Sequence, residues 1–274
     1  MQKSFELRTA TPDDYKKLKK LWALCFDDEA KVVDKFFSKT VTPENVVATF
    51  EGGGAVNAMY LLDSEIKTEK EKYNALYIYA VCTDPAYRGK GLMKKAFAFL
   101  ENLVCERNTD YLFLVPASDS LFKMYENLGF KTGFTYNEEV LYKTDAVLSD
   151  NKNTVLTYEH YIKLRESFPC EIPLATLKEK GFNSFYSPVG DTVKCLCNNR
   201  GYAVYETENG KVTVHELFGE KTELLNTVFN LSGKDTVTLR KPTENGCGVP
   251  FGMYRAFGDV PEIKNAFFGI PYGV

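Results

Sequence analysis

The stretch Val81-Cys82-Thr83-Asp84-Pro85-Ala86-Tyr87-Arg88-Gly89-Lys90-Gly91-Leu92-Met93 decides the fold that this sequence predicts. An apolar strand ends here, a turn with a proline and two glycines follows, and a helix begins at about Gly91. The first N–H groups of a helix lack partners within the helix, and together with the helix dipole they attract phosphate groups. Gly89 and Gly91 would let an anion approach the main chain without an intervening side chain. The stretch therefore predicts a phosphate-binding loop.

The loop differs from two common phosphate-binding motifs. A nucleoside-triphosphate loop has Lys followed by Ser or Thr after its glycines, whereas Lys90 is followed by Gly91. The dinucleotide fingerprint has three glycines at fixed spacing, and only two are present here. From these residues alone, two interpretations stay open. The loop either binds a ligand that carries phosphate, or it is a structural turn whose Arg88 and Lys90 side chains are directed to water.

Strand and helix patterns alternate on both sides of this loop. The β-branched and aromatic runs predict strands at residues 5–8, 46–50, 55–62, 73–82 and 111–115, with one or two more at 130–142. Helical spacing of apolar residues, with capping residues before it, predicts helices at 11–25, 29–38, 91–105 and 116–128. The charged stretch 64–72 is expected to be a loop. Such alternation is typical of an α/β fold.

A polar segment at residues 145–154, rich in Asp, Asn and Ser, separates two regions of the chain. Domain boundaries fall in such segments, so we expect a first domain at 1–145 and a second at 155–274. In the second region the patterns predict a helix at 158–167, a hairpin around Asn209-Gly210, a helix at 222–231 and a strand at 236–240. The order hairpin, helix, strand is similar to the order in the first region.

Two motifs of the first region resemble one protein superfamily. Arg88-Gly89-Lys90-Gly91 after Val81-Cys82-Thr83 resembles the pyrophosphate motif of the GCN5-related N-acetyltransferases (GNAT), which is Arg or Gln, two residues, Gly, one residue, and Gly or Ala. The last position is Met93 here, which departs from the general pattern but is similar to the enhanced-intracellular-survival-type branch, where a bulkier residue is frequent. The segment from Leu121 to Phe130 resembles the second signature, a tyrosine-bearing helix that ends in Gly-Phe. The run from Leu21 to Asp27 is similar to the first helix of the same branch, and the whole resemblance covers residues 5–142.

This resemblance implies a GNAT fold, in which helices flank a mixed, mostly antiparallel sheet, with a second, smaller and degenerate GNAT-like α/β domain. It implies that strand 73–82 splays from its neighbour and pairs with the pantetheine arm of acetyl-CoA through backbone groups of Val81 and Thr83. Amides from Arg88 to Met93 would hold the pyrophosphate, and an N–H of the splayed strand would polarise the thioester carbonyl. The expected cofactor-binding residues are Val81, Cys82, Thr83, Arg88, Gly89, Lys90, Gly91, Leu92 and Met93.

Tyr125 is the expected catalytic residue, because its place in the second signature implies that it protonates the departing thiolate. A phenol, with a pKa near 10, is a reasonable acid for a thiolate. We expect Cys82 to line the pantetheine channel through its backbone, since direct transfer needs no covalent enzyme intermediate. The general base stays open, with four carboxylates as candidates by position: Asp27, Asp28, Glu138 and Glu139. The only two histidines, His160 and His215, lie in the second region, where a structural role is commoner.

Composition limits the remaining classes of function. With 274 residues, 44% of them apolar, a net charge of −3 and no long basic run, the chain predicts a globular protein without a nucleic-acid partner. No signal core or bilayer-length apolar run is present, so a cytoplasmic protein without a membrane partner is expected. Scattered cysteines predict free thiols and no metal site. They are Cys25, Cys82, Cys105, Cys170, Cys195, Cys197 and Cys247.

The sequence as a whole predicts an N-acetyltransferase that moves an acetyl group from acetyl-CoA, a cosubstrate, to a primary amine by direct attack in a ternary complex. The acceptor, a small-molecule or peptide amine, would be bound by loops at 26–40 and 63–72 and by the second region. In the related branch the terminal carboxylate, here that of Val274, can enter the active site. Two alternatives are a non-catalytic CoA-binding sensor and an aminoacyl or fatty-acyl transferase on a related tandem fold. Pairing of sheet edges could form a homo-oligomer.

Overall fold

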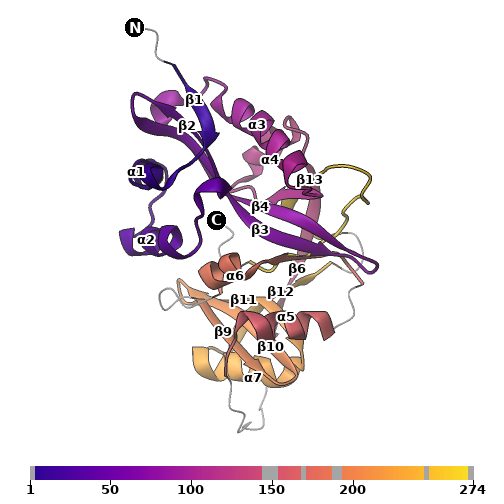
Figure 1. Ribbon diagram of the computed structural model, residues 1–274. Helices are drawn as coiled ribbons and strands as arrows, with labels where there is room; N and C mark the ends of the chain where they lie inside the picture. The colour runs from indigo at the N-terminus through magenta and orange to yellow at the C-terminus, as the bar shows by residue number, and fades with distance from the viewer. Residues whose placement is uncertain (1–3, 144–153, 168–170, 187–192, 244–246, 271–274) are drawn as a thin grey trace. The chain divides into compact units, whose positions relative to one another are not determined.

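The computed structural model describes residues 4–143, 154–167, 171–186, 193–243 and 247–270, and the chain divides into two compact units (Figure 1). Unit 1 consists of Met1–Ile66, Lys72–Lys131 and Met253–Glu262. Unit 2 consists of Lys67–Glu71, Thr132–Gly252 and Ile263–Val274. The two units are therefore of similar length, and each is described by itself below.

The first half of the chain alternates strands and helices as predicted. In chain order its elements are β1 (Glu6–Thr9), η1 (Pro12–Asp14), α1 (Tyr15–Cys25), α2 (Ala30–Lys39), η2 (Pro43–Asn45), β2 (Val46–Glu51), β3 (Gly54–Lys67), β4 (Lys72–Thr83), η3 (Pro85–Tyr87), α3 (Leu92–Glu106), β5 (Tyr111–Leu114) and α4 (Asp119–Glu126). In the sheet of unit 1, β1 to β5 follow one another in chain order, and the end of β13 (Val249–Ala256) lies beside β5. β1, β2 and β3 pair antiparallel, whereas β4 and β5 are parallel and joined by α3.

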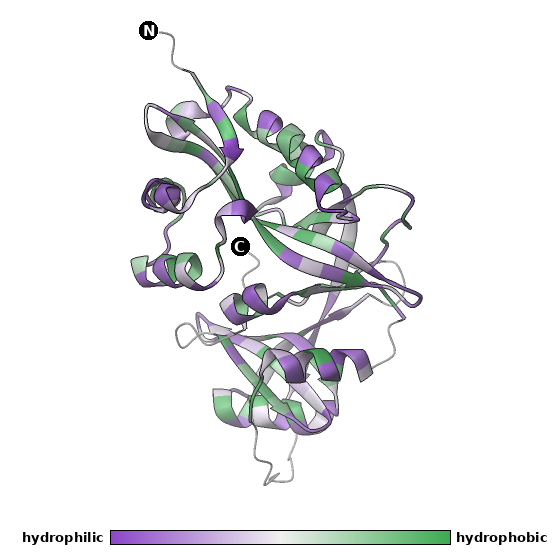
Figure 2. Ribbon diagram, in the orientation of Figure 1, coloured by the Kyte–Doolittle hydropathy of each residue, from purple (hydrophilic) through white to green (hydrophobic). Residues whose placement is uncertain are grey.

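Alternating side chains let the sheet of unit 1 pack on both faces. Met59 and Leu61 of β3, with Leu76 and Ile78 of β4, pack against Phe97 and other apolar residues of α3. The intervening Tyr60 and Tyr79 pack on the opposite face against Trp22 of α1 and Phe36 of α2. Period-two alternation along β3 and β4 therefore builds two separate cores. Figure 2 shows the matching mixture of hydrophobic and hydrophilic residues along α3.

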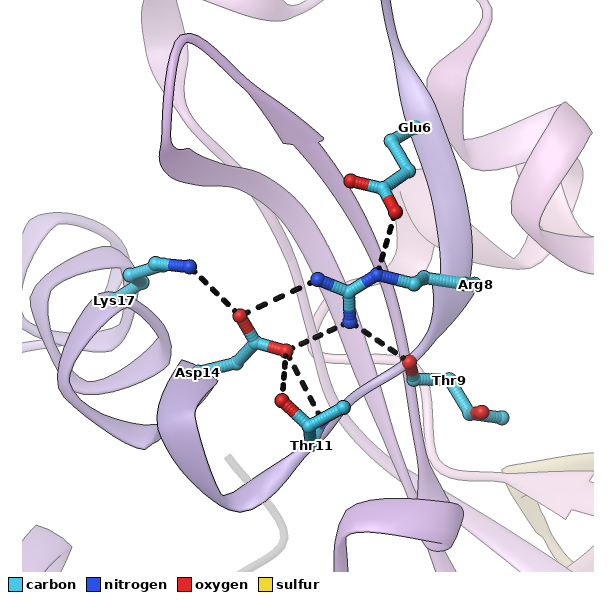
Figure 3. A network of polar contacts seen from close by, with 6 residues as sticks. All are labelled: Glu6, Arg8, Thr9, Thr11, Asp14 and Lys17. Atoms are coloured by element: carbon cyan, nitrogen blue, oxygen red, sulfur yellow. Dashed lines mark hydrogen bonds and ion pairs between the residues drawn. The ribbon is translucent and has the colours of Figure 1, made fainter.

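A buried carboxylate fixes the junction between β1 and α1 (Figure 3). Asp14, which is 1% exposed, accepts hydrogen bonds from Arg8 (2.7 Å), Lys17 (2.9 Å) and both the N–H and the hydroxyl of Thr11 (3.0 and 2.9 Å). The Arg8 guanidinium is the largest cause that holds the Asp14 pKa well below its usual range. The predicted helix start at Thr11-Pro12 is thereby confirmed, with Asp14 in the role that the third residue plays in a capping box.

The predicted loop at 64–72 is wrong, because β3 continues to Lys67 and β4 begins at Lys72. Ser64 and Ile66 are buried, whereas Asp63 is exposed and Glu65 is half-buried. This is the alternation of a half-buried strand, and the charges lie on its wet side. Only residues 68–71 form the turn, which the Thr68 N–H closes on the Glu71 carbonyl (2.8 Å).

Unit 2 has its own sheet and its own helices. Its elements are β6 (Lys131–Tyr142), β7 (Thr154–Val155), α5 (Tyr158–Ser167), β8 (Leu174–Leu177), α6 (Glu179–Phe185), β9 (Val193–Asn198), β10 (Gly201–Glu208), β11 (Lys211–Gly219), α7 (Lys221–Ser232), β12 (Thr236–Pro242) and the start of β13. The strand order is β13, β6, β12, β11, β10, β9, β7. Leu224, Val228 and Phe229 of α7 cover one face of this sheet. The predicted hairpin at Asn209-Gly210 is confirmed, with positive φ at both residues (48° and 77°).

A pattern of unit 1 recurs in unit 2. β9, β10 and β11 form an antiparallel meander, and α7 then returns the chain to β12, which is parallel to β11. The same parallel strand–helix–strand unit is made by β4, α3 and β5. However, the connection from β11 to α7 is the single residue Glu220, whereas the connection from β4 to α3 runs from Asp84 to Gly91. Unit 2 therefore repeats the topology without a loop that could hold a phosphate.

The division into units differs from the predicted domains 1–145 and 155–274 at three places. Lys67–Glu71, at the turn between β3 and β4, is assigned to unit 2. The other two differences concern strands. β6 belongs to unit 2, because it pairs with β12 from Tyr136 to Tyr142. Met253–Ala256 of β13 belongs to unit 1, because it pairs with Leu114–Tyr111 of β5. Long-range strand pairing, which leaves no local signal, causes both differences. Most of the polar segment 145–154, where the boundary was expected, lies outside the described residues.

Candidate active site

β4 and β5 separate halfway along β4. Their parallel register covers only Ala75–Tyr77, which pair with Tyr111–Phe113. β4 continues to Thr83, whereas β5 ends at Leu114. Within the described ranges, no strand pairs with Ile78–Thr83 on the side that faces away from β3. We call this side the open edge of β4. Its backbone groups can pair with an extended ligand in the way that they would pair with another strand.

Backbone hydrogen bonds show which residues of β4 face the open edge. The Cys82 carbonyl accepts a hydrogen bond from Nδ2 of Asn57 on β3 (2.8 Å), and the Asp84 N–H donates to the Val56 carbonyl (3.0 Å). Cys82 and Asp84 therefore direct these groups toward β3. Because successive residues of a strand direct their N–H and C=O groups to opposite sides, Val81 and Thr83 face the open edge. These are the two residues whose backbone was expected to bind pantetheine.

A break in β4 lies at the start of the open edge. Ile78 and Val81 both pack on the α3 side of the sheet, although residues three apart in a regular strand point to opposite faces. Ala80 between them has φ of +48°, a value that is uncommon for a residue other than glycine. Such conformations cost about 1–3 kcal/mol and are concentrated at functional sites. A break of this kind locally disrupts the ladder of backbone hydrogen bonds in a strand.

The predicted phosphate loop lies between β4 and α3 in unit 1. Gly89 and Gly91 have φ of +74° and +72°, and a Cβ added at either residue would meet no atom within 4 Å. Gly91 is the N-cap of α3, and no side chain caps the helix there. The first N–H groups of α3 are therefore left for a ligand. This arrangement is suited to bind a diphosphate. The N-cap is left-handed, the space around it is open, and a helix of 15 residues directs its N-terminus toward that space.

The two basic side chains of this loop turn back onto the protein. Arg88 Nε donates to the Thr83 carbonyl (3.3 Å), and Lys90 Nζ lies 4.3 Å from the centre of the Tyr87 ring. The Tyr87 hydroxyl donates to the Glu51 carboxylate, which also raises the pKa of Tyr87. Arg88 and Lys90 are nevertheless both exposed to solvent, so these contacts do not decide between the two interpretations of the loop. The main-chain amides are the part of the loop that remains for an anion.

Tyr125 lies in α4 and is 5% exposed. Its ring packs edge-on against Phe97 of α3 and Phe130, and it belongs to the same apolar cluster as Val81 and Met93. Burial raises the pKa of Tyr125 to about 12. Burial raises the pKa of Tyr77 well above its ordinary value, and the nearby Tyr79 and Tyr125 hydroxyls raise it further. The structure thus brings Tyr125 and the residues at both ends of the loop into one cluster of unit 1.

The candidate general bases are divided between the two units. Asp28 follows α1 and accepts a hydrogen bond from Trp22 Nε1 (2.8 Å). Glu138 and Glu139 belong to unit 2, where they pair with Arg240 (3.1 Å) and Lys241 (2.7 Å) across β6 and β12. The two histidines also belong to unit 2. Burial lowers the pKa of His215, which faces Glu206 (3.2 Å), and His160 Nδ1 contacts the Cys197 thiol (3.5 Å). The structure adds no reason to assign any of them as the base.

Sequence reasoning missed Asn57, which is fully buried on β3. Its Nδ2 binds both the Cys82 carbonyl and the Thr83 hydroxyl (2.8 Å each), so it holds the end of β4 in place. Its Oδ1 has no hydrogen-bond partner among the described residues. The sequence offered one sign of this role, because Asn57 is an amide residue within an otherwise apolar strand. A buried polar side chain is rarely left unpaired, so such a residue is expected to bind a neighbouring polar group.

The described residues contain no helix that is long and apolar enough to cross a membrane. They also contain no group of three or more His, Cys, Asp or Glu side chains that could hold a metal ion.

Comparison with known proteins identifies the domain that contains the candidate site. Residues 6–133 match the model of the acetyltransferase (GNAT) domain, which covers the strands, loop and helices described above. This part of the chain is therefore similar to the acetyltransferase (GNAT) domain family, and the predicted α/β fold is confirmed. A search of curated proteins gave no significant match.

Solved structures share the two-part fold. A GCN5-related N-acetyltransferase from Kribbella flavida has a TM-score of 0.74 at 14% identity, over 93% of this chain and 71% of that chain. One from Anabaena variabilis has 0.66 at 13% identity, over 92% and 73%. Eis1 from Mycobacterium abscessus has 0.65 at 9% identity, over 92% and 73%. At these identities the likeness concerns the fold.

Proposed function

We propose that this protein transfers an acetyl group from acetyl-CoA to a primary amine by direct attack in a ternary complex. The observation that carries the proposal is the combination, within unit 1, of an open edge on β4 and an uncapped α3 behind a loop with two left-handed glycines. An extended arm that ends in a diphosphate would fit both features at once. The family, which uses acetyl-CoA in general, supports the same choice of cosubstrate.

The main chain of unit 1 would bind the cosubstrate. Amides from Arg88 through Leu92 to Met93 hold the diphosphate, and Val81 and Thr83 pair with the pantetheine arm. The Cys82 carbonyl is bound by Asn57 on the side of β3, so pairing along the arm is left to the backbone of Val81 and Thr83. An N–H at the break in β4 near Ala80 donates to the thioester oxygen, where negative charge develops. When bound, acetyl-CoA supplies the thioester that an amine can attack.

Tyr125 would supply a proton to the leaving thiolate. Its raised pKa keeps the hydroxyl protonated across the whole neutral range, so the donor is always present. The same apolar surroundings that raise this pKa also make an unpaired thiolate unfavourable, which favours transfer of the proton. The acceptor amine must lose a proton before it attacks, and the group that takes this proton is unassigned.

Two measurements test the proposal. Calorimetry of purified full-length protein should show heat of binding with CoA, and much weaker heat with pantetheine, which lacks the diphosphate. Consumption of acetyl-CoA is then followed with polyamines, aminoglycosides and peptides as acceptors.

The outcomes separate this proposal from its alternatives. Binding of CoA without consumption of acetyl-CoA in the presence of any amine would support a CoA-binding sensor instead. Consumption of long-chain acyl-CoA or aminoacyl-tRNA in preference to acetyl-CoA would support the other acyl transferase. Absence of any heat with CoA would contradict all of these.

A further inference from the structure

The buried amide of Asn57 has one chemically consistent orientation. Its side chain lies 2.8 Å from the Cys82 carbonyl oxygen and 2.8 Å from the Thr83 hydroxyl oxygen. A carbonyl oxygen accepts hydrogen bonds and cannot donate them, so the amide atom that contacts Cys82 is Nδ2 and not Oδ1. The second hydrogen of the same Nδ2 is donated to the Thr83 hydroxyl oxygen. The direction of both hydrogen bonds is therefore fixed.

This orientation determines what the Thr83 hydroxyl can do. A hydroxyl group has one hydrogen to donate and two lone pairs that can accept. Because Asn57 donates to one lone pair, the hydroxyl hydrogen of Thr83 is directed away from Asn57. No acceptor for this hydrogen is found among the residues that the structure describes. Thr83 is half-buried, so a ligand can reach its hydroxyl. The end of β4 thus presents a side-chain donor in a fixed direction.

The Thr83 hydroxyl lies on the face of the sheet of unit 1 that α3 covers. Met59 and Leu61 of β3 pack on this face, and Asn57 shares it because alternate residues of a strand point to the same side. The contact with Asn57 places the Thr83 hydroxyl on the same face. Arg88 Nε, which belongs to the loop before α3, donates to the Thr83 carbonyl (3.3 Å). The hydroxyl therefore lies beside the loop that leads to the uncapped start of α3.

Thr49 of β2 provides a comparison on this face. It lies opposite Asn57 in the register of β2 and β3, and it is 2% exposed. Its hydroxyl has no hydrogen-bond partner among the described residues, and neither has Asn57 Oδ1. Asn57 thus uses both hydrogens of its amide at the end of β4, although a second hydroxyl lies on the adjacent strand. Thr83 differs from Thr49 because it is held by Asn57 and is accessible to a ligand.

We propose that the Thr83 hydroxyl donates a hydrogen bond to the diphosphate of acetyl-CoA, and that Asn57 is a positioning residue that directs this donor. The inference rests on the proposed function. Oxygens of a diphosphate are charged acceptors, and hydrogen bonds to charged acceptors are stronger than those between neutral groups. The loop supplies main-chain donors, and Thr83 adds a side-chain donor from the end of β4. Because Asn57 orients the hydroxyl before the ligand arrives, less freedom is lost on binding.

Variants of similar size test the hydroxyl. Thr83→Val replaces the hydroxyl with a methyl group, and calorimetry of the full-length protein should show a Kd for CoA about tenfold higher or more, as expected for the loss of one hydrogen bond to a charged group. Thr83→Ser restores the hydroxyl and should recover most of the affinity. Thr49→Val is the matched control, because it removes a buried hydroxyl from the same face, and it should bind CoA like the parent protein.

Two results with these variants would overturn the proposal. One is equal affinity of Thr83→Val and the parent protein for CoA. The other is a Thr83→Ser variant that binds as weakly as Thr83→Val, since the methyl group and not the hydroxyl would then matter. In both cases the parent protein still binds CoA, so the proposed function stands. If the parent protein shows no heat with CoA, the proposed function itself fails.

ADP as a second probe distinguishes the diphosphate from the pantetheine arm. ADP contains a diphosphate and no pantetheine, so Thr83→Val should weaken the binding of ADP by about the same factor as the binding of CoA. A loss confined to CoA would overturn the assignment to the diphosphate, as would a parent protein that binds CoA and not ADP.

A double-mutant cycle tests Asn57 as a positioning residue. If Asn57 acts through the Thr83 hydroxyl, Asn57→Ala should weaken CoA binding in the parent protein and have little further effect in Thr83→Val. Equal losses in the two backgrounds would show that Asn57 only supports the strand, and would overturn its positioning role. Asn57→Ser, a smaller polar variant, is taken through the same cycle so that the test does not depend on the folding of Asn57→Ala.

Discussion

At the scale of the residue, burial sets what Tyr125 can do. Its ring is held between Phe97 and Phe130, and the hydroxyl is the only atom that Tyr125→Phe removes. We therefore expect the variant to bind CoA like the parent protein and to turn over about 10²–10⁴-fold more slowly, the usual contribution of a positioned acid. Steady-state kinetics with calorimetry would check both values. Unchanged turnover would mean that the thiolate takes its proton from another group.

Asp14 carries a prediction about stability and pH. Its pKa is lowered in the folded protein, so the stabilisation is complete above the unfolded-state pKa of about 3.9 and is lost as pH falls below it. Asp14→Asn should destabilise the protein by about 1–3 kcal/mol near neutral pH, because Arg8 and Lys17 lose their charged partner. Urea unfolding at neutral pH and at about pH 3 would measure this, and the difference should shrink in acid. An equal difference at both pH values would contradict the assignment.

Single residues differ in how far sequence predicts them. The glycines of the loop and Tyr125 were predicted as site residues because they lie in compact motifs within a few positions of one another. Asn57 was missed because it meets the end of β4 only through the folded sheet.

At the scale of the element, the connection between β4 and α3 is the feature to test. Gly91→Ala places a side chain at φ of +72°, which costs about 1–2 kcal/mol, and brings a methyl group to the N-terminus of α3. We expect CoA affinity to fall. Gly258→Ala is the matched control, since this glycine of unit 1 also has positive φ (+76°) and open space but lies far along the chain from the loop. Equal CoA affinity in both variants would show that the loop does not bind the diphosphate.

Helices and strands were predicted well where the hydrophobic periodicity was clear. They were predicted poorly where charged residues obscured this periodicity. Val46–Glu51, Leu92–Glu106 and Tyr158–Ser167 match their patterns closely. The end of β3 was missed because its polar residues lie on the wet side of a strand whose other side, Ser64 and Ile66, is buried. The break at Ala80 could not be predicted, since alanine itself gives no sign of positive φ.

At the scale of the whole molecule, unit 2 repeats strand order without repeating the site. Its β11–α7–β12 segment has the parallel topology of β4–α3–β5, but one residue connects β11 to α7. Its interior contains a fully buried ion pair of Arg165 with Glu216 (2.8 Å), which Tyr202 and Tyr186 complete by hydrogen bonds. Such pairs fix a structure more than they stabilise it. The sequence revealed the repeated order, whereas the boundary between the units depends on pairings that only the fold reveals.

The assignment of β13 has a practical consequence for the isolation of unit 1. Met253 is buried in the core of unit 1, and the residues around it form hydrogen-bonded partners for β5. A fragment that stops near residue 145 would lack this neighbour of β5. Apolar side chains would be exposed, and β5 would become an unpaired edge strand that is prone to self-association. A stable piece that contains unit 1 is therefore expected to need Met253–Glu262 together with the residues up to Lys131.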